Sequence, residues 1–319
     1  MSTNENKGKK AEVTALQAIS AEDRKDWISL AFVQAGICVC VPAFLLGALL
    51  AEAMPIWPAI ISGSLGYLIV VVGMVATGMI GCDLGLASCT CCQAGFGKSG
   101  ARFIVSTIFA VNMIGWFGIQ NGVCGEAFSN AMLAMTGWDI PVVVSNTIWG
   151  IIMLLTAVYG VHALEKLDKI SIPLLMIIMC YGIFLAFKVY GTGNLNDEGT
   201  VQSMSFMSGV ALSFNFTAVG TITGPDYTRF QKSRKDTVKS VFYGVFPMGV
   251  ITLIMGIVLT KLSGQYDISM VLILDRSVWW RPLHLLFQHG QLTQQMLTAQ
   301  VLTLLWHLSL KITEEEKLL

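Results

Sequence analysis

Long apolar runs separated by short polar segments occupy most of the chain. A transmembrane helix needs about 20 apolar residues to cross a hydrocarbon core of about 30 Å. Seven runs reach that length, at residues 28–50, 56–80, 101–134, 140–163, 169–190, 202–223 and 237–262. The pattern predicts an all-α polytopic membrane protein with a polar tail at residues 1–27, a transmembrane domain at 28–263 and a C-terminal tail at 264–319.

Lys and Arg residues occupy alternate connections between the seven spans. The connections at 51–55, 136–141 and 191–200 contain neither residue. The connections on the opposite side carry Lys7, Lys9, Lys10, Arg24, Lys25, Lys98, Arg102, Lys166, Lys169, Arg229, Lys232, Arg234, Lys235 and Lys239. Because cytoplasmic connections are enriched in Lys and Arg, we expect a multi-pass protein of the cytoplasmic (plasma) membrane with a cytoplasmic N terminus.

The composition agrees with a chain surrounded by lipid. Hydrophobic residues make up 54% of the 319, charged residues make up 13%, and the mean hydropathy is +0.67. The formal net charge of zero gives no indication of a nucleic-acid partner. We expect the eight cysteines, which lie mostly within or beside the spans, to be reduced and structural. The sequence does not indicate an oligomeric state.

The connection at residues 83–100 contains two fragments of known motifs. Gly97-Lys98-Ser99 looks like the end of a phosphate-binding loop, but Cys92 stands where that pattern needs glycine. Cys89, Cys91 and Cys92 could in principle bind a metal, but a structural zinc site needs four ligands and no histidine lies near these cysteines in sequence. We therefore interpret the segment as a cytoplasmic connection and predict no metal.

The sixth span is interrupted near its end by Gly220, Thr221, Thr223, Gly224 and Pro225. Backbone groups that lose their helical partners inside lipid are costly unless they line a cavity or are buried in protein. An interrupted apolar helix is therefore typical of a transporter binding site. The alternative is a helix that is only kinked.

The first span has a similar feature between Gly36 and Pro42, where backbone carbonyls could turn away from helical pairing and coordinate a cation. Two interrupted helices in one chain strengthen the transporter interpretation.

The third span places Trp116 and Gln120 on one helix face, because they are four residues apart. An indole and an amide on one face suit a planar heterocycle, which can stack on the ring and hydrogen-bond to the amide. The alternative is helix packing with one interhelical hydrogen bond. Glu126 is an ionisable residue near mid-span, so it is a functional candidate, and a structural pairing fits it equally well.

These elements together resemble the nucleobase:cation symporter-1 family, and within it the cytosine permeases. The resemblance is carried by Gly115-Trp-Phe-Gly-Ile-Gln120 and by Gly220-Thr-Ile-Thr-Gly-Pro-Asp-Tyr-Thr-Arg-Phe230. It implies a LeuT-like transporter fold built from inverted repeats, which would be incomplete here, with about 7 of the usual 12 transmembrane helices.

The resemblance also implies particular site residues. The substrate ring would stack between Trp116 and Phe216, with Gln120 and Ala218 as further substrate-binding residues. Backbone carbonyls near Gly36 and Val39 would bind the coupling cation together with an eighth helix. The coupling ion would be a sodium ion or a proton, and no cofactor is implied.

The chain changes character after Leu274. Three of the four histidines (His284, His289 and His307) but only one of the 31 glycines (Gly290) lie beyond it. One interpretation is an amphipathic surface tail. The other is a shifted reading frame, because residues 289–306, reread from the third base of each codon, permit a sequence that resembles helix eight of the cytosine permeases. We hypothesise a frameshift near Leu274 and expect this truncated product to be inactive in transport.

The function predicted for the parent protein is cation-coupled uptake of a nucleobase, cytosine first, by alternating access. Its partners would be the small-molecule nucleobase and the lipid bilayer. Purine, hydroxymethylpyrimidine and allantoin are the alternative substrates within the same family. An enzyme is disfavoured because no metal or nucleophile constellation lies within the spans, and a channel is disfavoured because no filter or charged ring is visible. A non-transporting membrane scaffold, or pseudogene product, is the alternative for the 319-residue chain itself.

Overall fold

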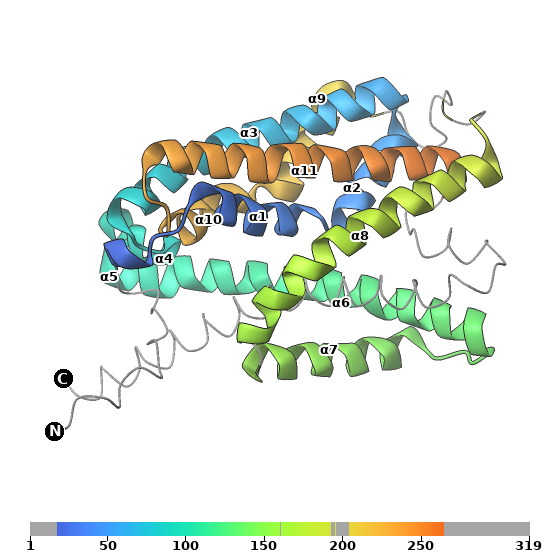
Figure 1. Ribbon diagram of the computed structural model, residues 1–319, viewed down its shortest axis with the longest axis horizontal. Coiled ribbons are helices and arrows are strands. Elements are labelled where there is room, and N and C mark those ends of the chain that lie inside the picture. The colour runs from blue at the N-terminus through green and yellow to red at the C-terminus, as the bar shows by residue number, and fades with distance from the viewer. Residues whose placement is uncertain (1–17, 160, 193–194, 196–203, 265–319) are drawn as a thin grey trace.

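The apolar runs fold into helices throughout the part of the chain that the computed structural model describes, which is residues 18–159, 161–192, 195 and 204–264 (Figure 1). Outside the helices, one isolated β-bridge joins Lys25 to Gln231. Residues 1–17 and 265–319 lie outside the described residues, and so does the predicted change of reading frame near Leu274.

The first run forms two helices. A short 3₁₀ helix, η1 (Ala21–Asp23), precedes α1 (Trp27–Cys38), and α2 (Val41–Ala53) follows at an angle of 55°. Val39 and Cys40 between them have non-helical backbone angles. The first turn of α2 contains Pro42, which has no amide hydrogen and is therefore tolerated at a helix start. The helix is thus interrupted between Gly36 and Pro42.

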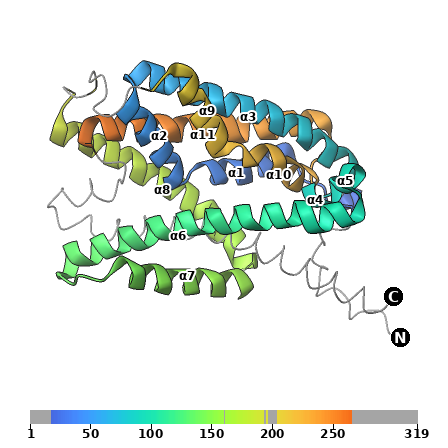
Figure 2. The same cartoon turned by 180° about the vertical axis from the view of Figure 1, so that it is seen from behind.

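One group of helices packs around α11 (Arg234–Ser263), with α1 and α2 along one side and α3 (Ile56–Leu84) along another (Figures 1 and 2). Close approach depends on glycine, because a side chain at Gly244 would collide with the backbone of Ala31 and one at Gly256 with the backbone of Phe44. The apolar core lies between these helices and includes Leu46, Leu50, Tyr67, Leu253 and Ile257.

The sixth run forms α9 (Phe206–Thr217) and α10 (Val219–Thr228), which pack along α3. The side-chain hydroxyl of Ser213 donates to the carbonyl of Gly63, and that of Thr228 donates to the carbonyl of Gly78, both at 2.7 Å. These two hydroxyl-to-carbonyl bonds, one from α9 and one from α10, hold the pair of helices against α3.

A second group of helices begins after the connection at residues 85–105, which contains α4 (Ser88–Cys91), α5 (Gln93–Gly100) and the π-helical turn η2 (Ala101–Val105). The long helix α6 (Ser106–Thr136) follows, and α7 (Val142–Tyr159) returns alongside it. The helix α8 (Val161–Tyr190) then crosses from the end of α7 to α11, as Figure 1 shows. The cavity described below lies where α6 faces α9 and α10.

The chain is a multi-pass membrane protein. Four helical segments of the described part are long and apolar enough to cross a membrane, 56–84, 93–130, 206–228 and 234–263, and the bent α1–α2 pair makes a fifth. Shorter apolar stretches lie at residues 142–154 within α7 and 179–190 within α8. The expected boundary between the fourth and fifth spans differs most from the structure, because α8 begins at Val161 rather than near residue 169. The total of seven spans stays a prediction.

Candidate functional site

A cavity of about 400 Å³ lies between α6 and the α9–α10 pair. Its volume falls within the range of about 300–1,000 Å³ that is typical of small-molecule sites. It is lined by Ile108, Phe109, Asn112, Trp116, Ile119, Asn215, Phe216, Ala218, Val219 and Ile222. The lining is therefore mainly apolar and aromatic, with two side-chain amides.

Trp116 of α6 and Phe216 of α9 approach each other across this cavity. Their ring centroids are 5.3 Å apart and their planes are inclined at 82°, an edge-to-face contact. Both rings are half-buried and line the cavity. A planar ligand could lie between them only after they separate and turn towards parallel, so the sandwich implied by the resemblance stays a prediction.

The remaining two predicted substrate residues differ in position. Ala218 lines the cavity at the junction of α9 and α10. Gln120 lies one turn beyond Trp116 on α6 and is buried, with 8% of its surface exposed, but it is not among the residues that line the cavity. The structure thus brings Trp116, Phe216 and Ala218 together and leaves Gln120 beside them.

The sequence interpretation missed the two amides in the cavity wall. Asn112 lies one turn before Trp116 on the same face of α6, and Asn215 directly precedes Phe216 in α9. The spacing of four residues between Asn112 and Trp116 was the available signal. Both side chains can donate and accept hydrogen bonds, as the edge of a nucleobase requires.

The predicted helix break in the sixth span is wrong in position. Gly220, Thr221, Thr223, Gly224 and Pro225 all lie inside α10, and α9 and α10 meet at Ala218, which belongs to neither helix. Even Ala218 has right-handed helical backbone angles, φ −55° and ψ −30°.

The helix continues through Pro225 because a neighbouring helix replaces the missing hydrogen bond. The hydroxyl of Thr77 in α3 donates to the carbonyl of Thr221, the group that the residue at 225 would otherwise pair. Gly224 serves close packing instead of a break, since a side chain there would collide with Thr77 and the backbone of Met74. On the facing helix α3, a side chain at Gly81 would collide with Pro225.

The two predicted cation-binding positions lie at the interruption of the first run. Gly36 is within the last turn of α1, and Val39 is in the non-helical link, with its amide donating to the carbonyl of Ala35. Both residues are buried. A link with non-helical backbone can present carbonyl oxygens to a cation, and cation binding by Gly36 and Val39 stays a prediction.

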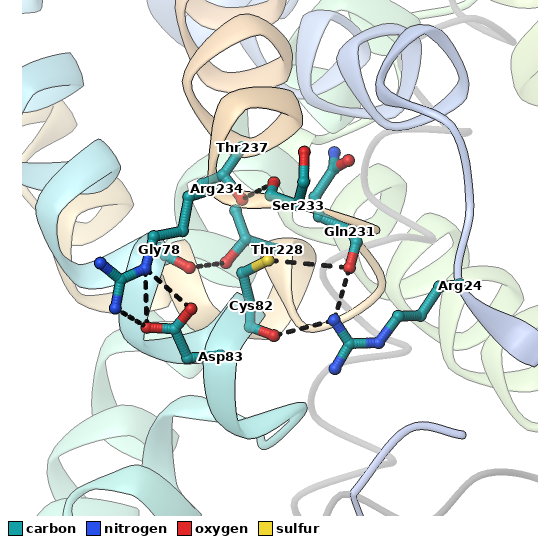
Figure 3. Close-up of polar contacts among 9 residues, drawn as sticks. All are labelled: Arg24, Gly78, Cys82, Asp83, Thr228, Gln231, Ser233, Arg234 and Thr237. Atoms are coloured by element: carbon teal, nitrogen blue, oxygen red, sulfur yellow. Dashed lines mark hydrogen bonds and ion pairs between the residues drawn. The ribbon is translucent and has the colours of Figure 1, made fainter. Parts of the chain in front are cut away.

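At the end of α10, polar contacts attach the α10–α11 link to α3 (Figure 3). Arg24 donates to the carbonyls of Cys82 and Gln231 at 3.0 and 2.9 Å. Arg234 forms a two-pronged ion pair with Asp83. These contacts join the segment before α1, the C-terminal end of α3 and the start of α11.

The other candidate groups lie away from the cavity. Glu126 is exposed on α6, several turns from Trp116. The thiol of Cys89 in α4 is partly buried. Its pKa is raised to about 11, mainly by burial and to a smaller extent by the negative charge of Asp226, so the neutral thiol is favoured. Within the described residues no group of three or more His, Cys, Asp or Glu side chains is placed to hold a metal ion.

Comparison with known proteins finds permeases similar to this chain over most of its length. A family model described as "Permease for cytosine/purines, uracil, thiamine, allantoin" matches residues 19–311. Cytosine permease of Escherichia coli (strain K12) is 27% identical over 254 residues, which cover 78% of this chain and 58% of that protein. Purine-uracil permease NCS1 of Arabidopsis thaliana is 25% identical over 247 residues, which cover 69% of this chain and 41% of that protein.

The chain therefore spans little more than half the length of the first of these relatives. The family match continues past Leu274, the residue near which a frameshift is hypothesised. The frameshift itself stays a hypothesis.

Two solved structures of the protein Mhp1 share the fold at 18% sequence identity. Its inward-facing conformation gives a TM-score of 0.76 and covers 91% of this chain and 65% of that one. A closed conformation with bromovinylhydantoin bound, described as a nucleobase-cation-symport-1 family transporter, gives a TM-score of 0.73 with coverages of 90% and 66%. The LeuT-like transporter fold expected from the sequence is confirmed.

The matched relatives are permeases and not enzymes. Because the family model matches most of its length, this chain belongs to the family of permeases for cytosine/purines, uracil, thiamine and allantoin.

Proposed function

We propose that this chain contains the substrate site of a nucleobase transporter and binds cytosine in the cavity between α6 and α9–α10. The observation that carries the proposal is the pairing of Trp116 and Phe216 on opposite walls of a cavity of about 400 Å³, with Asn112 and Asn215 beside them. Flat apolar rings and amides are the groups that recognise a planar base with hydrogen-bonding edges.

Cytosine is proposed ahead of other bases because the E. coli relative at 27% identity is a cytosine permease. Purine, hydroxymethylpyrimidine and allantoin are the alternatives within the family. Competition by each compound against labelled cytosine would rank them. If any of these compounds displaced labelled cytosine more strongly than unlabelled cytosine does, the choice of cytosine would be overturned.

Coupling to a cation, either a sodium ion or a proton, is the second part of the proposal. The interruption at Val39 and Cys40 supports it, because carbonyl oxygens there are not all used by helical pairing. We further propose a location in the cytoplasmic membrane with the N terminus in the cytoplasm, on the basis of the distribution of Lys and Arg.

Binding of radiolabelled cytosine to the purified 319-residue chain tests the site directly. Trp116→Ala should weaken binding about 5- to 150-fold, because stacking of a base on an aromatic ring contributes about 1–3 kcal/mol. Trp138→Ala is the matched control, since it also removes an indole but from a position 70% exposed in the α6–α7 connection. Equal losses in both variants, or none in Trp116→Ala, would overturn the proposed site.

Transport needs a separate experiment. We predict that cells expressing only the 319-residue chain take up no more labelled cytosine than cells with an empty vector. Uptake above that background would contradict the prediction that the chain is inactive in transport. It would not decide the position of the binding site, which the binding experiment tests.

A further inference from the structure

The start of α11 carries cations where the electrostatics of the helix oppose them. Arg234, Lys235 and Lys239 lie within its first two turns, near the positive end of the helix dipole, where added positive charge is unfavourable. Arg234 is compensated by its ion pair with Asp83, and the neighbouring Lys232 is compensated by Asp26. Among the described residues, Lys235 and Lys239 have no carboxylate partner.

The position of Lys239 along α11 places it at the edge of the bilayer. Residues 240–260, which follow it, contain no Asp, Glu, Lys or Arg. At 1.5 Å per residue this segment is about 30 Å long, which matches the hydrocarbon core. Lys239 is therefore at the level of the lipid headgroups, with Lys235 one turn further from the hydrocarbon.

Two aromatic residues accompany these lysines at the same level. Trp27 is the first residue of α1, and its ring centroid lies 6.0 Å from that of Tyr243, one turn beyond Lys239. The ammonium of Lys239 lies 5.8 Å from the Trp27 ring centroid. Tyr243 is 58% exposed. Trp and Tyr at this depth are typical of contact with the headgroup and glycerol region of lipids.

We infer that Trp27, Lys235, Lys239 and Tyr243 form a binding site for one anionic phospholipid. Lys235 and Lys239 meet the phosphate, and Trp27 and Tyr243 lie along the glycerol and upper acyl chains. Charge complementarity selects an anionic lipid over a zwitterionic one, because the nearby carboxylates already have partners: Asp26 pairs with Lys232, Asp83 pairs with Arg234, and Asp236 accepts a hydrogen bond from the Ser233 hydroxyl. The lipid joins the first turn of α1 to α11.

Native mass spectrometry of the purified 319-residue protein, with phosphatidylglycerol or phosphatidylcholine added, tests the inference. The unaltered protein should retain phosphatidylglycerol selectively. The K235Q/K239Q variant should bind it about 30-fold more weakly, at about 1 kcal/mol per lysine, whereas K235R/K239R should bind it within about threefold of the unaltered protein. The control K98Q/K188Q removes the same charge from exposed positions on α5 and α8 and should retain the lipid.

A second measurement locates the lipid. Phosphatidylglycerol with brominated acyl chains should quench a component of the tryptophan fluorescence that disappears in Trp27→Phe. Equal loss of lipid in K98Q/K188Q and K235Q/K239Q would overturn the inference, as would quenching that is unchanged in Trp27→Phe. Displacement of the lipid by millimolar inorganic phosphate would also overturn it, because the site would then be one for a free anion.

Discussion

The hydroxyl of Thr77 in α3 donates a 2.6 Å hydrogen bond to the carbonyl oxygen of Thr221 in α10, 144 residues away in sequence. Thr221 is the residue whose carbonyl would be paired by the amide at position 225, and Pro225 has no amide hydrogen. The carbonyl oxygens of Gly73 and Met74 also lie near the Thr77 hydroxyl oxygen, at 3.2 and 3.3 Å. The hydroxyl has a single hydrogen, and the carbonyl oxygen of Thr221 is its nearest acceptor. A contact between two helices thus replaces one within a helix.

Thr77→Val should destabilise the protein by about 1–3 kcal/mol, because it leaves the carbonyl of Thr221 without a donor. In a Pro225→Ala background the same substitution should cost less, since the alanine amide can pair that carbonyl. Thermal unfolding of the four proteins of this cycle in detergent measures the difference. An equal cost of Thr77→Val in both backgrounds would show that the bond to Thr221 is not what Thr77 contributes.

Gly125→Ala should disturb the contact between α6 and α7. A side chain at Gly125 would overlap the amide oxygen of Asn146, whereas one at Gly122, three residues earlier on α6, would meet nothing within 4 Å. We expect Gly125→Ala to cost about 1–3 kcal/mol in unfolding free energy. Gly122→Ala should be neutral or stabilising by up to about 1 kcal/mol. Similar unfolding temperatures for the two variants would contradict this packing.

Asp226→Ala should loosen α4. Both carboxylate oxygens of Asp226 accept hydrogen bonds from Ser88, one from the backbone amide at 2.9 Å and one from the hydroxyl at 2.8 Å. Removing the acceptors leaves a buried amide unpaired and should cost about 1–3 kcal/mol. Hydrogen exchange of residues 86–92 should become faster in this variant, less so in Asp226→Asn, and not at all in Asp139→Ala, which alters an exposed carboxylate elsewhere. Unchanged exchange in Asp226→Ala would refute the link.

Asn215→Ala should reduce the affinity for cytosine without altering stability. The amide lines the cavity next to Phe216 and is otherwise exposed, so its loss removes a hydrogen-bonding group from the ligand's surroundings. A single hydrogen bond of about 0.5–1.5 kcal/mol corresponds to a loss of about 2- to 13-fold. Equilibrium binding of labelled cytosine measures it, with Ile222→Val as a control that changes the wall but removes no polar group. Unaltered affinity in Asn215→Ala would place the base elsewhere.

Sequence alone determined that the chain is a helical membrane protein with a transporter fold. The physical reason is that crossing lipid depends on the local run of apolar residues, which can be read without knowing any neighbour. The resemblance carried by Trp116 and Gln120, and by the segment from Gly220 to Phe230, indicated the family. The aromatic pair was expected from that resemblance, and the structure places both rings at one cavity.

Tertiary structure decided which of these residues meet and which backbone groups stay free. The presence of Pro225 led us to predict a helix break, but the hydroxyl of Thr77 on another helix supplies the missing hydrogen-bond donor. No local sequence pattern reveals such a partner. The rotation of α6 likewise depends on its contact with α7, where Asn121 donates to the carbonyl of Asn146 and Gly125 makes room for the Asn146 side chain. That packing turns Asn112 and Trp116 to the cavity wall and leaves Gln120 beside it, because helical spacing defines a face but only a neighbouring helix defines its direction.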